Sequence, residues 1–372
     1  MAQQDKKIRV IWLVGGGTGG HIMPLLAVAE VLRMQRHVRL YYIGEGNSLE
    51  EKLAKQHGIR FCTITSGKLR RYFTLVALWQ NLRDGLRLVW GIGQSYRLIR
   101  KTHPDLIFTK GGYVTLPVAI AAWLTKTPLI AHESDSVIGK TNRLIAYFAR
   151  RILTAFPADV YPLAIASKVT MVGLPLRSDF TRTAARHHHS RIPMVLITGA
   201  SQGALAINDA FAPIIPALLE KAAITHITGA LSYERFRALR EHLPSDLRER
   251  YAVLDFTPDI ADYMREATVV VSRSGSTIFE LATLRKPMML IPLPSAAHNH
   301  QFKNAEIFVR HKAAVLLEQA NLTPESLLTT LEQVLADRAM QQRLQEGTVR
   351  FDCHKSAQVV ASLLLKEIGA SL

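Results

Sequence analysis

The residues best placed for chemistry lie in four glycine-rich turns that could aim backbone amides at phosphate groups. Glycine lets the chain approach a ligand closely, and a helix that starts after the turn offers free N–H groups and a partial positive charge. The turns are Gly15–His21, which contains the spacing GxGxxG, Lys110–Val114, Ser201–Gly203 and Ser272–Thr277. Any one of them could be a tight connection without a ligand. Four together favour two phosphorylated ligands, one of them a nucleotide diphosphate.

A single GxGxxG turn is also typical of enzymes that bind a nicotinamide dinucleotide. Such an enzyme would have an acid at the end of its second strand, and Glu45 is loosely placed for that role. This interpretation does not account for the other three turns. A nicotinamide-dependent oxidoreductase remains an alternative, which thermal stabilisation by NAD(P)H would support.

Three side chains are candidates for a base that takes the proton of an incoming hydroxyl. His21 directly follows the first glycine turn, and Glu133 and Asp135 follow an apolar run. An imidazole or a carboxylate can serve as a general base when it lies within hydrogen-bond reach of that proton. The sequence favours His21 and Glu133 and leaves Asp135 as the third candidate.

Metal chemistry has little support in the sequence. The chain contains no Asp-x-Asp pair, and His298 and His300 form an HxH pair without a third ligand. The run His187–His189 lies in a polar stretch and is better explained as part of a linker. Cys62 and Cys353 lie far apart without CxxC spacing, which indicates free thiols in a reducing compartment. We expect no metal and no cofactor.

Short apolar runs that alternate with helical stretches must position these residues. Most runs are continuous, as expected for parallel strands covered by helices on both faces. The candidate strands are Ile8–Val14, Val38–Ile43, Leu106–Thr109, Leu129–Ala131, Arg151–Thr154, Val169–Val172, Met194–Ile197, Thr225–Ile227, Ala252–Asp255, Thr268–Val271 and Met288–Ile291. With 372 residues, the chain suits two domains. We predict an α/β fold of two doubly wound, Rossmann-like domains that face one another across a cleft.

The polar stretch Leu176–Pro193 has no periodicity and predicts an interdomain linker. We therefore place the N-terminal domain at residues 1–183 and the C-terminal domain at residues 184–350. Residues 351–372 contain a predicted amphipathic helix, Val359–Ile368, that could pack back on the N-terminal domain.

Charge is divided unevenly between the two halves of the chain. The net charge is +16, and residues 1–185 carry 26 Lys and Arg against 11 Asp and Glu, whereas residues 186–372 carry 20 against 19. A basic N-terminal half favours an anionic partner such as a phospholipid surface, a pyrophosphate or a nucleic acid. No zinc-finger or RNP motif supports nucleic-acid binding. Basic residues that only aid solubility are the remaining alternative.

Residues 66–101 predict a helix that lies on a membrane surface. They include eight Lys and Arg, opposed by Asp84 alone. Apolar and indole side chains recur among these cations at helical spacing, which suits the headgroup region of a bilayer. We expect membrane contact by Leu75, Trp79, Leu82, Arg83, Leu86, Arg87 and Trp90. An ordinary helix that packs on the core is the alternative. No run of about 18 uncharged apolar residues could span a bilayer.

Seven short motifs occur in an order that resembles one enzyme family. They are GGTGGH at Gly16–His21, GGYV at Gly111–Val114, HE at His132–Glu133, GxPxR at Gly173–Arg177, SQGA at Ser201–Ala204, SRSG at Ser272–Gly275 and NA at Asn304–Ala305. From about residue 8 to about residue 320, the chain resembles the MurG family, the bacterial N-acetylglucosaminyltransferases of glycosyltransferase family 28 that make lipid II from lipid I. The resemblance implies the GT-B fold, transfer with inversion of the anomeric centre, and no catalytic metal.

The resemblance also implies roles for individual residues. His21 corresponds to a histidine proposed as general base, and Arg177 to the arginine of the interdomain segment. Thr257 corresponds to the position whose backbone reads the uracil edge, and Glu280 to the acid that binds the ribose hydroxyls. The other expected substrate-binding residues are Thr18, Gly19 and Gly20 at the pyrophosphates, Ser201 at the UDP phosphates, and Asp135, Gln301 and Asn304 at the sugars.

Three of the motifs depart from the family pattern. Many members have HEQN where this chain has His132–Asp135, so Asp135 replaces an asparagine. Leu174 replaces the asparagine of GNPxR, and His300 replaces the first glutamine of a Gln-Gln pair. The sugar contacts are therefore the part of the site at which this chain differs from the family.

The resemblance assigns the acceptor and the membrane surface to the N-terminal domain and UDP-GlcNAc to the C-terminal domain. The expected partners are UDP-GlcNAc, lipid I, an anionic membrane surface and other proteins of cell-wall synthesis, with no nucleic acid. The expected location is the cytoplasmic face of the cell membrane, as a peripheral protein. A transferase of the same fold that acts on diacylglycerol is the alternative, and UDP release with each lipid would distinguish the two.

Overall fold

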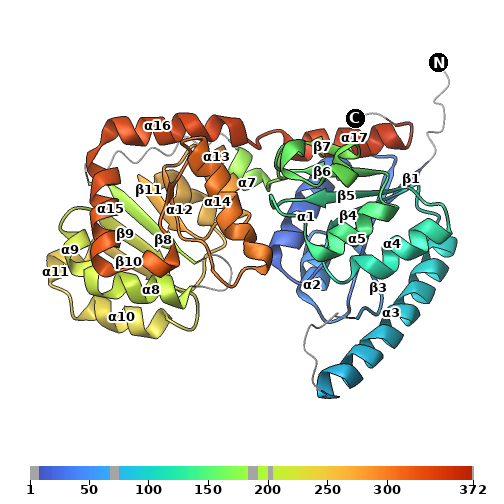
Figure 1. The fold of residues 1–372 in the computed structure, drawn as a ribbon, viewed down its shortest axis with the longest axis horizontal. Coiled ribbons are helices and arrows are strands. Elements are labelled where there is room, and N and C mark those ends of the chain that lie inside the picture. The colour runs from blue at the N-terminus through green and yellow to red at the C-terminus, as the bar shows by residue number, and fades with distance from the viewer. Residues whose placement is uncertain (1–7, 68–74, 183–191, 200–203, 371–372) are drawn as a thin grey trace. The chain divides into compact units, whose positions relative to one another are not determined.

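The computed structural model describes residues 8–67, 75–182, 192–199 and 204–370, without the side chains of residues 75–82. The chain divides into two compact units, which Figure 1 shows in the colours of the sequence. Unit 1 comprises Met1–Arg177 together with Lys355–Leu372, and unit 2 comprises Ser178–His354. Unit 2 is therefore continuous in sequence, whereas unit 1 is completed by the C-terminal segment.

Unit 1 is built on a sheet of seven parallel strands in the order β3-β2-β1-β4-β5-β6-β7. The strands are β1 (Arg9–Gly15), β2 (Val38–Gly44), β3 (Arg60–Thr63), β4 (Leu106–Gly111), β5 (Leu129–Glu133), β6 (Arg151–Thr154) and β7 (Val169–Met171). The helices are α1 (Gly19–Arg33), α2 (Leu49–Gln56), α3 (Leu75–Thr102), α4 (Thr115–Leu124), α5 (Lys140–Phe148), α6 (Leu163–Ala166) and α17 (Ser356–Glu367).

Unit 2 is built on a sheet of six parallel strands in the order β10-β9-β8-β11-β12-β13. The strands are β8 (Met194–Thr198), β9 (Ala223–Ile227), β10 (Tyr251–Leu254), β11 (Val269–Ser272), β12 (Met288–Leu290) and β13 (Val315–Leu316). The helices are α7 (Ser178–Thr181), α8 (Leu205–Phe211), α9 (Ile215–Leu219), α10 (Tyr233–Glu241), α11 (Ser245–Arg248), α12 (Ile260–Glu266), α13 (Thr277–Thr283), α14 (His300–Arg310), α15 (Pro324–Ala336) and α16 (Arg338–Thr348).

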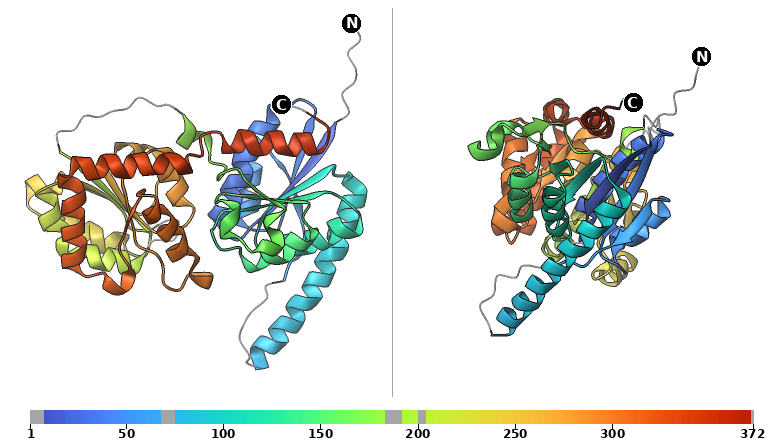
Figure 2. Two further views of the ribbon diagram at one scale, coloured as in Figure 1. Left: turned by 45° about the horizontal axis from the view of Figure 1, so that its top comes forward. Right: turned by 90° about the vertical axis from the view of Figure 1, so that its right-hand side faces the viewer.

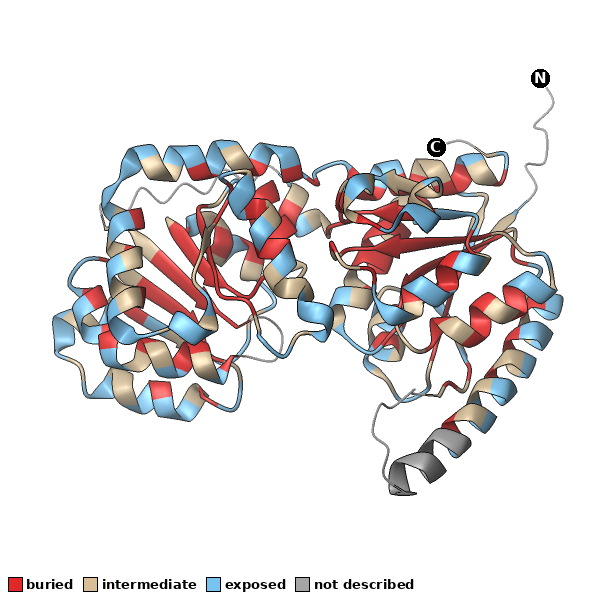
Figure 3. Cartoon of the chain, in the orientation of Figure 1, coloured by how far each residue is buried: buried red, intermediate tan, exposed pale blue. Residues whose placement is uncertain are grey.

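The central strands are buried on both faces, which explains their continuous apolar runs. Ile11–Val14 of β1 and Val269–Val271 of β11 are 0% exposed, and Figure 3 shows both sheets as the buried centres of their units. This arrangement confirms the predicted α/β fold class and the eleven predicted strands. The sequence pattern missed β3 and β13, which are short strands at the edges of their sheets.

Part of the predicted linker is folded. Ser178–Thr181 forms the short helix α7, and its Phe180 is buried. The buried side chain of Phe180 packs this segment on unit 2. The sequence did not reveal this packing, because the segment shows no apolar periodicity. The rest of the linker, residues 183–191 with the run His187–His189, lies outside the described residues.

Helix α17 is part of the core of unit 1 although it follows unit 2 in the chain. It packs on α1 and β4, and Val360, Leu364 and Leu365 are 0% exposed in the same cluster as β1. The Glu367 carboxylate forms a salt bridge with the Arg150 guanidinium at 2.7 Å. These contacts close the core of unit 1.

Helix α3 reaches beyond the sheet of unit 1, as Figures 1 and 2 show. Its C-terminal half packs on α4, and a second contact comes from the segment after β3. The amide of Thr65 donates to the side-chain carbonyl of Gln94 at 2.6 Å. A Cβ atom at Gly91 would lie 2.1 Å from the Thr65 carbonyl oxygen, so glycine is needed for this close approach. No helix in the described ranges combines the length and the apolar content needed to cross a membrane.

Candidate active site

The topology of unit 1 brings the first two glycine turns to one place. The chain runs from β1 outward to β2 and β3 and then returns to β4 on the other side of β1. The connections after β1 and β4 therefore leave in opposite directions. Doubly wound folds bind ligands at such a point, outside the carboxyl ends of the strands. The turns Gly15–Thr18 and Gly111–Val114 flank it.

The two turns touch, and several of their positions require glycine. Gly17, Gly111 and Gly112 have φ angles of 95°, 97° and 90°, a region that disfavours other residues. A Cβ atom at Gly112 would lie 2.6 Å from the Gly16 carbonyl oxygen. The glycines thus allow two backbone turns to pack against each other at the start of α1.

The start of α1 is open to an anion. Thr18 has extended backbone angles, its side chain does not cap the helix, and the first turn contains no acidic residue. Gly17, Thr18 and Gly20 are exposed, and a Cβ atom at Gly19 would meet no atom within 4 Å. The free amides of a first helical turn attract negative charge, so this turn suits a phosphate.

His21 is half-buried beside this turn. Its Nδ1 lies 3.1 Å from the Thr18 hydroxyl. Burial and the charge of Lys110 lower the pKa of His21 to about 4, whereas Asp135 and a hydrogen bond to the Gly16 carbonyl oppose the shift. The imidazole is therefore neutral at pH 7 and retains a nitrogen lone pair.

Glu133 ends β5, and its buried carboxylate accepts hydrogen bonds from four donors, three in the following loop and one on α5. Oε1 accepts from the amides of Ser134 at 2.8 Å and Asp135 at 3.1 Å. Oε2 accepts from the Gly139 amide and the Asn142 side chain, both at 3.0 Å. Burial and the Asp135 carboxylate raise the pKa of Glu133, opposed by Lys110 and the backbone amides. Because four donors fill the acceptor positions of a carboxylate, this geometry suits a scaffold better than a base.

Further contacts fix the loop that carries Asp135. His132 Nε2 lies 2.9 Å from the Gly173 carbonyl oxygen, which can only accept, so this nitrogen carries a proton. The Tyr161 hydroxyl donates to the Asp135 carbonyl at 2.9 Å. The Asp135 side chain is half-buried and interacts electrostatically with His21. The structure thus brings His21 and Asp135 into one site with Glu133 beneath them.

Glu45 follows β2 and is already engaged by two hydroxyl groups. Its carboxylate accepts from Ser66 at 2.6 Å and from Tyr113 at 3.1 Å. A dinucleotide-binding acid needs its oxygens for ribose hydroxyls. These bonds argue against that use of Glu45 and instead tie the GGYV turn to the end of β2.

In unit 2 the strand order reverses between β8 and β11 in the same way. The turn after β11, Ser272–Ser276, flanks this point and precedes α13. The turn after β8 contains Ser201, which lies outside the described residues together with Ala200–Gly203. Both glycine-containing turns of unit 2 therefore follow the two strands at its ligand-binding edge.

Helix α14 supports the turn after β11. The Ser274 hydroxyl donates to the Gln301 carbonyl at 2.8 Å, and the Asn304 amide donates to the Ser274 carbonyl at 3.1 Å. Gln301 Oε1 accepts from the Leu293 amide at 2.9 Å. Asn304 is 0% exposed, so its side chain holds the turn rather than facing solvent.

Of the remaining predicted positions, Thr257 and Glu280 follow the carboxyl ends of strands of the unit 2 sheet, and Arg177 belongs to unit 1. Thr257 follows β10, and its hydroxyl accepts from the Asp259 amide at 3.1 Å. The preceding Phe256 is 69% exposed. Glu280 is half-buried on α13. Arg177, also half-buried, is the last residue of the first segment of unit 1.

Each of the two units contains a match to a known domain family. Residues 11–154 match the glycosyltransferase family 28 N-terminal domain, and residues 194–359 match the family 28 C-terminal domain.

The chain belongs to glycosyltransferase family 28.

Two relatives span most of this chain. One from Treponema pallidum, named UDP-N-acetylglucosamine–N-acetylmuramyl-(pentapeptide) pyrophosphoryl-undecaprenol N-acetylglucosamine transferase, is 33% identical over 337 residues, which cover 88% of this chain and 87% of the relative. One from Bacillus cereus, whose name differs only by the number 2 at its end, is 34% identical over 342 residues. These residues cover 90% of this chain and 93% of the relative. A crystal structure of Acinetobacter baumannii MurG is 26% identical in sequence and matches with a TM-score of 0.76. The match covers 96% of this chain and 99% of that one. These matches confirm the resemblance, the GT-B fold and the assignment as a glycosyltransferase.

Sequence reasoning missed two buried polar residues beside the candidate site of unit 1, Lys110 and Asn142. Lys110 is 1% exposed, and its Nζ donates to the Ser134 hydroxyl at 2.9 Å. Asn142 is buried and donates to Glu133. A lysine directly after the apolar run of β4 was the available signal for the first. Nothing in the local sequence marked Asn142, because its partner lies on another element.

No group of three His, Cys, Asp or Glu side chains within the described ranges is arranged as metal ligands. His300, the first residue of α14, instead has its Nδ1 2.8 Å from the Ala297 carbonyl oxygen in the preceding loop.

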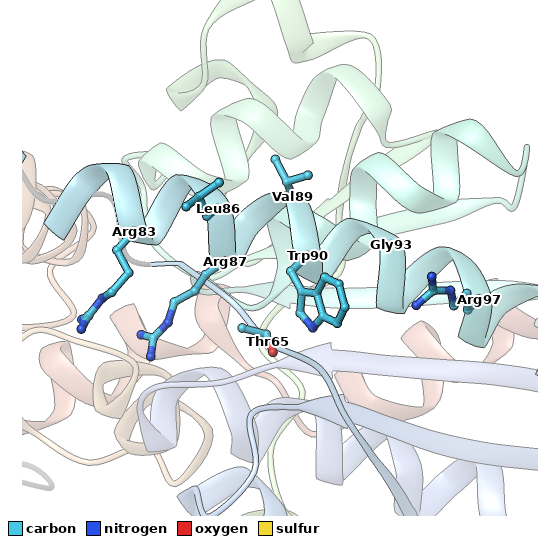
Figure 4. Close-up of a pocket in the computed structure, with 8 residues that line it drawn as sticks. All are labelled: Thr65, Arg83, Leu86, Arg87, Val89, Trp90, Gly93 and Arg97. Atoms are coloured by element: carbon cyan, nitrogen blue, oxygen red, sulfur yellow. The ribbon is translucent and has the colours of Figure 1, made fainter. Parts of the chain in front are cut away.

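A pocket of about 480 Å³ lies along α3 in unit 1. Its lining includes Arg83, Arg87, Arg97 and Trp90, and Figure 4 shows Arg83, Arg87 and Trp90 on the side of the helix that faces Thr65. Leu86, Val89 and Trp90 are 67%, 67% and 59% exposed. The side chains of Leu75, Trp79 and Leu82 lie outside the described residues. The described half of the predicted membrane face is thus exposed, apolar and basic.

Proposed function

We propose that the chain transfers N-acetylglucosamine from UDP-GlcNAc to undecaprenyl-pyrophosphoryl-MurNAc-pentapeptide, lipid I, in peptidoglycan synthesis. The observation that carries this proposal is that relatives with this activity in their names align across both units. Unit 1 also has two glycine turns at the carboxyl edge of its sheet, and in the sequence of unit 2 glycine-containing segments follow β8 and β11, which suits one diphosphate in each. We place the acceptor on unit 1 and UDP-GlcNAc on unit 2.

The reaction is a single displacement. The acceptor hydroxyl oxygen attacks the anomeric carbon, and the bond from that carbon to UDP breaks with its electron pair passing to the departing phosphate. Attack opposite the leaving group inverts the anomeric centre. The amides of Gly19 and Gly20 bind the acceptor pyrophosphate, and in unit 2 Ser201, Thr257 and Glu280 bind the phosphates, uracil and ribose.

His21 takes the hydroxyl proton. Its neutral imidazole lies at the phosphate-binding start of α1, whereas the carboxylate of Glu133 is filled by donors. Binding of the acceptor pyrophosphate adds negative charge near His21 and stabilises the imidazolium that forms. Asp135 of unit 1 orients the acceptor sugar, and Gln301 of unit 2 binds the sugar of UDP-GlcNAc.

We infer that no metal takes part. Leaving-group charge is balanced by backbone amides, which act without a cation when they are aimed at the developing charge. The absence of an Asp-x-Asp pair and of a three-ligand cluster in the described ranges supports this inference. Transfer should therefore be unchanged by EDTA, and loss of turnover on chelation would contradict it.

Transfer to a lipid I analogue, measured by UDP release and by the product's anomeric configuration, tests the proposal. We expect release with lipid I, no release with diacylglycerol, and a rise in Tm with UDP-GlcNAc but not with NAD(P)H. His21→Ala should lower kcat about 10²-fold with little change in Tm, because the ring is half-buried at an exposed turn. Near-full turnover of His21→Ala would remove it from the mechanism.

We further propose that unit 1 binds the cytoplasmic face of the cell membrane through α3, as a peripheral protein, where other cell-wall enzymes are available as partners. The exposed Leu86, Val89 and Trp90 beside arginines support this proposal. Each arginine near an anionic surface contributes about 1 kcal/mol.

The double variant Leu86→Ser, Trp90→Ser should lose sedimentation with vesicles that contain anionic phospholipid, without a fall in Tm. Leu231→Ser is the matched control, because Leu231 is 86% exposed but belongs to unit 2. Equal vesicle binding by the double variant and the wild type would refute the membrane assignment.

A further inference from the structure

Lys110 is a buried charge to which the proposed reaction gives no role. It lies in β4, is 1% exposed, and donates one hydrogen bond to the Ser134 hydroxyl at 2.9 Å. An ammonium group has three N–H donors, and burying it is costly unless nearby groups compensate. Packing alone therefore does not explain a lysine at this position.

The groups that compensate Lys110 are those of the acceptor site. Burial lowers the pKa of Lys110, and the carboxylates of Glu133 and Asp135 oppose that shift. A Cβ atom at Gly15 would lie 3.5 Å from the Lys110 Cβ, so the lysine starts directly beside the first glycine turn. It thus lies between the turn that carries His21 and the loop that carries Asp135.

We propose that Lys110 is a positioning residue for the acceptor site, which fixes the Asp135 loop through Ser134 and by its charge adds to the effect of burial in disfavouring the protonated form of His21. The inference rests on the proposed function, since it concerns the base of that reaction. It adds a residue that acts through His21 and Asp135 without touching the substrate.

Several titratable groups surround the first glycine turn. They are Lys110 on β4, Tyr113 after β4, Glu133 and Asp135 at the end of β5, and Glu50 on α2, next to His21 itself on α1. Lys110 disfavours the protonated imidazole, and Asp135 favours it. Without the ammonium, burial alone opposes the effect of Asp135 on the His21 pKa, so His21 should protonate at a higher pH.

The test is an NMR titration of His21 in the whole free protein, with its signal assigned from the His21→Gln spectrum. In the wild type, His21 should stay neutral down to about pH 5, because its pKa is about 4. In Lys110→Met, the titration midpoint should rise by about one unit or more. The acid limb of kcat/KM should move to higher pH by the same amount. A midpoint in Lys110→Met equal to that of the wild type would overturn the inference.

Three variants separate charge from packing. Lys110→Gln keeps a donor for Ser134 without the charge and should show the same rise in the His21 titration midpoint. It replaces Lys110→Met as the test if the Lys110→Met protein does not fold. Ser134→Ala keeps the charge and should lower kcat/KM without a shift. The matched control is Lys168→Met, which removes a part-buried lysine of unit 1 that donates to the Ala146 and Ala149 carbonyls at 3.0 and 3.1 Å. A shift in Lys168→Met as large as in Lys110→Met would refute a specific role of Lys110.

The titration needs no substrate, so failure of the inference and failure of the proposed function are distinguishable. If the wild type transfers no N-acetylglucosamine but the His21 midpoint rises in Lys110→Met, the electrostatic part of the inference stands and the proposed function fails. If transfer occurs and the midpoint does not move, the inference fails alone.

Discussion

At the scale of single residues, the loop after β5 shows how neighbours in sequence take different roles. His132 and Glu133 are buried and make their hydrogen bonds within unit 1, to Gly173 and to the loop itself. Asp135 is half-buried and acts electrostatically on His21. This segment therefore combines two buried residues of the scaffold with a half-buried carboxylate that acts on His21.

The scaffold role of Glu133 predicts a loss of stability rather than a simple loss of chemistry. In Glu133→Gln, the side-chain NH2 group must face two of the four donors that now bind the carboxylate, and donors left unpaired in a buried site cost about 1–3 kcal/mol. Urea unfolding should show this loss in the free energy of unfolding. Glu45→Gln is the control, and its free energy of unfolding should fall less. The partners of Glu45 are hydroxyl groups, which can rotate and accept a hydrogen bond from the new amide. A stable but inactive Glu133→Gln protein would instead indicate a catalytic carboxylate.

At the scale of elements, the start of α1 is the feature most directly built for an anion. A strand ends in a glycine turn, the helix begins without a side-chain cap, and the GGYV turn packs against it. The second glycine turn therefore allows the close packing of the two turns, since a side chain at Gly112 would push the first turn away. In unit 2, α14 supports the turn after β11 by a different route, through Ser274 and Asn304.

Gly19→Ala should separate binding from stability at this element. The added methyl group meets no protein atom within 4 Å, and alanine favours a helix over glycine, so Tm should stay equal or rise. The methyl group would occupy the approach of the pyrophosphate, and kcat/KM should fall about tenfold or more. Gly85→Ala on α3, where a Cβ atom also meets nothing, should leave kcat/KM unchanged. Equal kcat/KM in Gly19→Ala and the wild type would place the pyrophosphate elsewhere.

At the scale of the whole molecule, each unit contains a buried neutral histidine that links stability to pH. Burial holds the pKa of His132 in unit 1 and of His226 in unit 2 at about 3, below the ordinary 6.5. His226 lies 3.1 Å from both the Tyr251 hydroxyl and Asn208 Oδ1. Unfolding releases both rings to bind protons at a higher pH. Their contribution to stability is therefore complete above pH 6.5 and is lost as the pH falls toward 3.

The free energy of unfolding should fall with decreasing pH below 6.5, by up to about 1.4 kcal/mol per pH unit for each of these histidines. Urea unfolding at pH 7.5 and pH 5.5 would measure this dependence. His226→Gln should weaken it for unit 2, whereas His354→Gln, which changes an exposed ring of the same unit, should not. Identical pH dependence in His226→Gln and the wild type would show that His226 does not govern it.

The sequence by itself determined the fold class, the central strands, the glycine turns and the family, because apolar runs, glycines and short motifs are properties of neighbouring residues. It could not rank Glu133 against His21, and it missed Lys110, since the deciding contacts join residues far apart in the chain. Lys110 meets Ser134 24 positions away, and His132 meets Gly173 41 positions away. These pairs exist because β4, β5 and β6 lie side by side in the sheet. The tertiary structure alone decided which polar groups are buried and satisfied and which remain available for chemistry.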